Sequence, residues 1–189
     1  VRQVRAGDRL FSEHGFEGTT LEAVADALGY TKPALYYYFH SKEDLFLSLI
    51  LDSLRAASLR IEDIFAQDKT PSGKLRDLIR LYLDDHFTNR GYFSITHLLK
   101  SFKDSMPEGE DKAEIERLSR GIHEPIMATI AQGIALGEFK DEDPKLLGSI
   151  VFAMLSGILI HIDMPALSGI SHDKLKSCLD EIIVKGISA

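Results

Sequence analysis

The sequence predicts an all-α protein in which a small N-terminal three-helix domain precedes a larger helical domain. Apolar residues recur at the spacing of an α-helix along most of the 189 residues. Short segments rich in Gly, Pro, Ser and Asp separate these runs, as expected between helices, and we find no pattern typical of a strand. We expect residues 1–45 to form the first domain and residues 46–189 the second.

An amphipathic helix is predicted between Thr20 and Gly29. Thr20 can cap its N-terminus, and Gly29 stands where a left-handed residue usually ends a helix. The apolar residues of this helix fall at i, i+3, i+4 and i+7, so they share one side that we expect to pack in the core: Leu21, Val24, Ala25 and Leu28.

The next helix is predicted from Lys32 to Phe39, directly after the glycine turn. Thr31 can cap it, and Pro33 is tolerated in its first turn because an early N–H has no helical acceptor. On a helical wheel, Leu35 and Phe39 mark the buried side. Two helices joined by such a turn are typical of the helix-turn-helix, a DNA-binding motif.

The tyrosines of the second helix favour a role at a surface. On the same wheel Tyr37 points away from the core and Tyr36 lies on a flank, whereas Tyr38 is expected closer to the packed side. An outward phenol adds nothing to a core, but it can donate to a phosphate. Lys42 follows just past the helix, where we expect its ammonium to meet the next phosphate, and Ser41 can cap the long helix that begins there.

Residues 4–46 resemble the DNA-binding domain of the tetracycline-repressor (TetR) family of bacterial transcription regulators. The likeness is carried by pieces at fixed spacing: Leu10-Phe11, Gly15-Phe16, Thr19-Thr20, Gly29, the run Leu35 to Phe39, and Ser41-Lys42-Glu43 with Leu45. Gly7 replaces the alanine usual in the family, which costs the first helix about 0.5–1 kcal/mol of intrinsic preference. The resemblance implies DNA contacts from Thr20, Leu21, Thr31, Lys32, Pro33, Ala34, Tyr36, Tyr37 and Lys42.

The first turn of the second helix is expected to face base edges, and the tyrosines with Lys42 are expected to hold phosphates. Lys32 is the only strong donor in that turn, and guanine is its preferred partner. Pro33 and Ala34 favour contact with thymine methyl groups.

The rest of the chain has the length and helical pattern of the family's variable regulatory domain. A long helix is expected to leave the first domain and enter the second, over residues 42–67. Further helices are predicted over residues 74–88, 92–103, 112–136, 144–162 and 172–185. Pro125 lies inside one of them and should kink it.

Aromatic side chains and methionines in the middle helices, with a few polar groups among them, suit a pocket for a small apolar or amphipathic effector. The same residues would also suit an ordinary helical core, and both interpretations stay open. The residues concerned are Tyr82, His86, Phe93, His97, Phe102, Met127 and Met154.

The helix over residues 150–162 is apolar around much of its circumference, and the last helix is amphipathic. One domain does not easily cover both, so we predict a two-fold, four-helix interface between two copies of the chain. Two core helices in a monomer are the alternative. The interface residues predicted are Ile150, Ala153, Gly157, Ile160, His161, Leu175, Leu179 and Ile182.

The charge of the chain is unusual for a nucleic-acid binder. The net charge is −7, and residues 1–50 hold five Lys and Arg against seven Asp and Glu. We therefore predict modest non-specific affinity for DNA and a shallow dependence on salt. The lone Cys178 fits a reducing cytoplasm and is expected to be buried. The longest apolar stretch, about 14 residues, is shorter than the roughly 20 of a membrane span.

No motif for catalysis is found. The seven histidines are scattered, and HExxH, CxxC and phosphate-loop patterns are absent from the sequence. We therefore predict no enzymatic activity, metal or cofactor. The interpretation is a cytoplasmic, homodimeric, ligand-responsive repressor that binds a palindromic DNA operator. A helical ligand carrier or enzyme, or a protein-binding adaptor, with a vestigial helix-turn-helix is the alternative.

Overall fold

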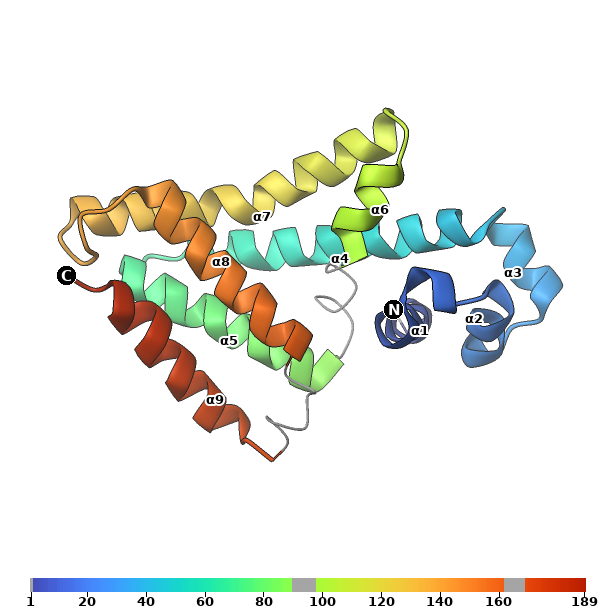
Figure 1. The fold of residues 1–189 in the computed structure, drawn as a ribbon, viewed down its shortest axis with the longest axis horizontal. Coiled ribbons are helices and arrows are strands. Elements are labelled where there is room, and N and C mark those ends of the chain that lie inside the picture. The colour runs from blue at the N-terminus through green and yellow to red at the C-terminus, as the bar shows by residue number, and fades with distance from the viewer. Residues whose placement is uncertain (1, 90–97, 162–168) are drawn as a thin grey trace.

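The computed structural model describes residues 2–89, 98–161 and 169–189, and its regular elements there are helical. Three short helices form one end of the molecule: α1 (Arg2–Gly18), α2 (Leu21–Leu28) and α3 (Lys32–Tyr38). The 24-residue helix α4 (Lys42–Phe65) runs from this end into the rest of the protein (Figure 1). The predicted all-α fold is confirmed.

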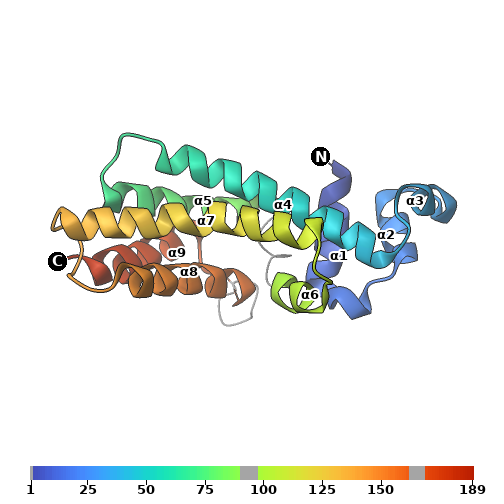
Figure 2. The same cartoon turned by 90° about the horizontal axis from the view of Figure 1, so that it is seen from above.

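The larger part of the molecule contains the remaining helices. They are α5 (Pro71–Asn89), α6 (Leu99–Ser105), α7 (Glu110–Ala135), α8 (Pro144–His161) and α9 (His172–Leu179), followed by a π-helical turn, η3 (Asp180–Lys185). Helices α4 and α7 pack along each other, α8 packs on α7, and α5 contacts α4, α7, α8 and α9. The C-terminus lies at the end opposite α2 and α3, as both views show (Figures 1 and 2).

Side-chain caps define where the helices of the first domain begin. Thr20 Oγ1 accepts a hydrogen bond from the N–H of Ala23 at 3.2 Å, and Thr31 Oγ1 accepts one from Ala34 at 3.4 Å. Ser41 caps α4 in the same way. All three predicted caps form, and Gly29 ends α2 in the left-handed conformation, with φ of 71°.

A glycine bend shapes α1 near its end. Gly15 has φ of 71° and ψ of 176°, a combination that essentially only glycine adopts. The buried Thr19 secures the bend, because its hydroxyl donates to the carbonyl of Gly15 at 2.8 Å. The chain therefore turns sharply at this point and brings Phe16 back toward α4.

Two further predictions about the second domain concern α7 and α6. α7 continues through Pro125 as one helix from Glu110 to Ala135. The N-terminal part of the helix predicted over residues 92–103 lies outside the described residues, and α6 covers only Leu99–Ser105.

The C-terminal segment formed by α9 and η3 buries every fourth residue. In an ideal α-helix, residues four apart do not all point in the same direction. Leu175, Leu179, Ile183 and Ile187 are all buried. At 3.6 residues per turn, each step of four advances the side chain by about 40° beyond a full turn. The wider π-helical turn compensates for this drift. Cys178 is exposed, contrary to the prediction, because Leu175 and Leu179 take the inner side.

Candidate nucleic-acid interface

The outer face of α3 carries three tyrosines. Leu35 is buried and fixes the helix to the core, whereas Tyr36, Tyr37 and Tyr38 are exposed. Tyr37 is 79% exposed, as the helical wheel predicts for an outward position. These phenols give the end of the molecule an aromatic, hydrogen-bonding surface.

Tyr38 is a correction to the sequence prediction. It is 69% exposed rather than turned toward the packed side, and its ring meets that of Tyr37 edge-on at 5.2 Å. The helical wheel fails here because α3 ends at Tyr38, and Phe39 has an extended backbone with φ of −129°. Phe39 packs partly against the core instead.

The first turn of α3 is accessible. Lys32 and Pro33 are exposed with the capping Thr31, and Ala34 is half-buried. The Lys32 ammonium is paired with the Glu22 carboxylate of α2 and lies 5.7 Å from the centre of the Tyr36 ring. Glu22 is therefore a member of this surface that the sequence did not reveal, since a contact across the turn has no local pattern.

The start of α2 divides between surface and core. Thr20 is exposed, but Leu21 is buried. The side chain of Leu21 belongs to the apolar side that holds α2 in place, and a DNA contact from this residue stays a prediction.

Lys42 is a second correction. Its ammonium donates to the carbonyl oxygen of Phe16 at 2.8 Å and lies 4.3 Å from the centre of the Phe16 ring. The side chain is only 22% exposed. Lys42 therefore joins α4 to the end of α1 in this structure, and it does not extend outward to meet a phosphate. The glycine bend places Phe16 within its reach.

Four phenylalanine rings meet where α1, α4 and α6 come together. Phe46 contacts Phe11 with ring centres 4.7 Å apart, Phe16 at 5.0 Å and Phe102 at 4.8 Å. Phe16 and Phe102 are also in contact, at 5.6 Å. We call these four residues the phenylalanine cluster. It joins the first domain directly to α6 of the second.

Of the residues predicted to line an effector pocket, Tyr82, Phe102, Met127 and Met154 are described, and they belong to α5, α6, α7 and α8. Phe102 belongs to the phenylalanine cluster. Tyr82 is fully buried, and burial raises the pKa of its phenol. Met127 and Met154 are half-buried on α7 and α8. Phe93 and His97, with the side chain of His86, lie outside the described residues.

Two polar groups in the second domain were missed by the sequence analysis. The hydroxyl of Ser53, on α4, is buried and has no hydrogen-bond partner among the described residues. The His123 ring of α7 meets the Phe152 ring of α8 edge-on at 4.2 Å, and burial lowers the pKa of this histidine. A single serine within an apolar stripe gives no signal in the sequence that its hydroxyl is buried without a hydrogen-bond partner.

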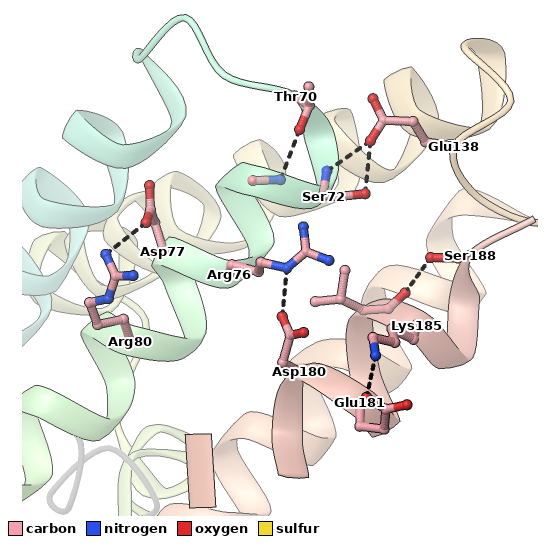
Figure 3. Close-up of polar contacts among 12 residues, drawn as sticks. Thr70, Ser72, Arg76, Asp77, Arg80, Glu138, Asp180, Glu181, Lys185 and Ser188 are labelled. Atoms are coloured by element: carbon pink, nitrogen blue, oxygen red, sulfur yellow. Dashed lines mark hydrogen bonds and ion pairs between the residues drawn. The ribbon is translucent and has the colours of Figure 1, made fainter. Parts of the chain in front are cut away.

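A surface groove of about 390 Å³ lies between α5 and the C-terminal helix, lined by Arg76, Arg80, Lys176 and Asp180 among others. Arg76 Nε donates to Asp180 at 2.7 Å, and Arg80 pairs with Asp77 (Figure 3). Each arginine thus already has a carboxylate partner. None of the predicted pocket residues lines this groove.

One side of α8 is covered by the core and the other is open. Leu147, Val151 and Leu155 are buried, whereas Leu146, Ile150, Ala153 and His161, on a neighbouring side of the helix, are exposed. A Cβ atom placed at Gly157 on that open side meets nothing within 4 Å. The side chain of Ile160 lies outside the described residues.

The C-terminal helix contributes less to this open face than predicted. Ile182 is 53% exposed, but Leu175 and Leu179 are buried within the chain itself. Those two residues are core residues of the subunit, because α9 turns them toward α5.

The described part of the chain offers no group of His, Cys, Asp or Glu able to hold a metal ion. None of its helices is both long and apolar enough to cross a membrane.

Models of known protein families match both domains of this chain. Residues 4–49 match the family model for bacterial regulatory proteins of the tetR family, and residues 68–159 match that for a tetracyclin repressor-like C-terminal domain. The transcriptional repressor AcnR of Corynebacterium diphtheriae is 27% identical over 179 residues, which are 91% of this chain and 83% of AcnR.

Solved structures share the fold. The TetR-family regulator PfmR of Thermus thermophilus has a TM-score of 0.78 at 24% identity, over 100% of this chain and 96% of PfmR. The regulator FadR of Bacillus subtilis, in complex with stearoyl-CoA, has a TM-score of 0.74 at 21% identity, over 98% of both chains.

Replacing Lys42 by Met should lower the free energy of unfolding by about 1–2 kcal/mol, because the variant keeps the apolar stem but loses the charged hydrogen bond and the ring contact. Denaturant unfolding followed by circular dichroism measures the change. Lys174→Met, at an exposed position, is the matched control and should change stability little. Equal stability of the two variants would contradict the structural role of Lys42.

Proposed function

Because this chain belongs to the TetR family of bacterial transcription regulators, it is a DNA-binding regulator, and we propose that it is a repressor acting as a homodimer on a palindromic operator in the cytoplasm. The observation that carries the proposal is the outer face of α3, where Lys32 and the three tyrosines are exposed on a helix anchored by Leu35. A small effector then releases the repressor from DNA.

In this proposal α3 enters the major groove with its first turn toward the bases. Lys32 donates to guanine, while Pro33 and Ala34 meet thymine methyl groups. Tyr36 and Tyr37 donate to phosphates, and the exposed Tyr38 joins them. The capped start of α2 at Thr20 contributes to backbone contact.

The open side of α8 supports the homodimer. Leu146, Ile150, Ala153, Gly157 and His161 fall within one narrow stripe of this helix, and the exposed Ile182 follows on the C-terminal turn. Apolar side chains gathered on one exposed face are typical of an interface. Two-fold pairing through this face would set two α3 helices against one palindrome.

The buried hydroxyl of Ser53 supports an effector site in the second domain. A buried polar group without a partner is rare in native proteins and is often satisfied by a ligand or by water. The surrounding core of α4, α5, α7 and α8 is largely apolar, and Thr129 of α7 is the other polar residue buried in it among those described. We therefore propose an amphipathic effector, and the stearoyl-CoA complex of FadR makes acyl-CoA esters the first class to test.

Two substitutions on α3 should separate base reading from phosphate contact. Lys32→Ala should reduce discrimination about tenfold at one position per half-site. Tyr37→Phe should weaken binding to every sequence alike, by about fivefold, because only one phosphate donor is lost. Fluorescence polarisation with the duplex selected from a randomised pool, and with its single-base variants, measures both. A uniform loss for both variants would contradict this division.

A charge on the open face should separate the subunits. Ile182→Lys should convert the dimer to a monomer in sedimentation velocity and weaken binding to the full palindrome toward that of one half-site. Leu59→Lys, at an exposed leucine of α4, is the matched control and should leave the dimer intact. A wild-type monomer at micromolar concentration would refute the homodimer.

Acyl-CoA esters from isovaleryl to stearoyl should include one that raises the melting temperature and weakens DNA binding. Ser53→Ala should raise the concentration of that ester needed for release by about fivefold, because one hydrogen bond is lost. Ser58→Ala, on the same helix, serves as the control. A panel in which no ester changes either measurement would exclude this class of effector.

A further inference from the structure

An ion pair lies at the junction of α2 and α3, on the face that presents the tyrosines. Lys32 is the first residue of α3, and the Glu22 carboxylate that it pairs with belongs to the first turn of α2. The ammonium also lies 5.7 Å from the centre of the Tyr36 ring, one turn along α3. Both charged side chains are about half exposed, so the pair stands at the surface and not inside the domain.

Both partners are held in their charged forms. The hydrogen bond from Lys32 lowers the pKa of Glu22, and the same bond raises the pKa of Lys32. Glu22 therefore places a full negative charge on the face that meets DNA. A duplex approaching α3 meets an ammonium that is already occupied.

A phosphate and the edge of a guanine base differ in charge, so they interact differently with the Lys32–Glu22 ion pair. A phosphate is an anion, so Glu22 repels it and competes with it for the ammonium. The edge of guanine is neutral and offers O6 and N7 as acceptors. Because an ammonium has three N–H donors, Lys32 can bond guanine and keep Glu22 at the same time.

We propose that Glu22 is a specificity-determining residue, which restrains Lys32 from binding phosphates and leaves it free to read guanine. The inference rests on the proposed function, in which α3 reads the operator. Glu22 acts through Lys32 and needs no contact with a base. This role also explains why an acidic residue, Glu22, lies on a surface that binds the polyanion DNA.

The test compares Glu22→Gln, which keeps the shape of the side chain and removes its charge, with the wild-type protein. Binding to an unrelated duplex should rise about two- to fivefold, the range expected for an exposed ion pair. The plot of log K against log[salt] should steepen by about one for each α3, because Lys32 becomes free to neutralise a phosphate. Affinity for the selected duplex should change less, so that the ratio of the two affinities falls.

Two controls separate this role from a general effect of charge. Asp26→Asn makes the same change of charge on the same helix, at an exposed residue that pairs with no cation among those described. It should leave the affinity ratio unchanged. In the Lys32→Ala background, Glu22→Gln should no longer alter the ratio, because its effect passes through the ammonium. Melting temperatures should be alike for all variants, since the pair is exposed.

The outcomes are distinguishable. A wild-type protein that binds no duplex from the pool would overturn the DNA-reading role of α3 itself. Wild-type discrimination that Glu22→Gln leaves intact, or that Asp26→Asn lowers equally, would overturn only the role given to Glu22. The same loss with and without Lys32 would also overturn it.

Discussion

The phenylalanine cluster, together with the bond from Lys42 to Phe16, fixes how the DNA-reading end sits on the rest of the molecule. Phe46 lies fully buried among the other three rings. Phe11 and Phe16 come from α1, Phe46 from α4, and Phe102 from α6, so helices of both domains share one packed contact. The ribbons of these three helices lie close together (Figure 2). Aromatic rings packed at these separations interdigitate and resist sliding. The cluster therefore joins α1, and with it the DNA-reading end, to α4 and α6.

Local signals predicted the first domain, and contacts between distant residues explain what they missed. Thr20, Thr31 and Ser41 cap as expected because capping depends on a few neighbouring residues. Tyr38 was placed wrongly because a helical wheel assumes that the helix continues, and Lys42 because its acceptor is 26 residues away. In the second domain Phe102 joins a contact that no local pattern encodes, and nothing in the sequence distinguishes Ser53 from a core serine with a partner.

The acidity of the first domain becomes understandable once the cations are located. Lys42 is used inside the protein, and Lys32 is paired with Glu22, so neither is an unrestrained charge for phosphates. A single reader of this kind gains little from the general attraction between protein and DNA. Tight binding would then depend on two α3 helices engaging together and on neutral donors such as Tyr37, which favours selectivity over strength.

The ring contributed by Phe102 also bears on how far the two domains can be treated as interchangeable modules. In hybrid regulators, which join a DNA reader from one protein to a sensor from another, the natural place to cut is along α4. Here such a cut would remove the α6 ring from the cluster and expose Phe46 to water. A functional chimera must therefore supply another aromatic side chain at the position of Phe102. The part to be transferred is then the DNA-binding domain together with the side chains that contact it, and not a continuous segment of the sequence alone.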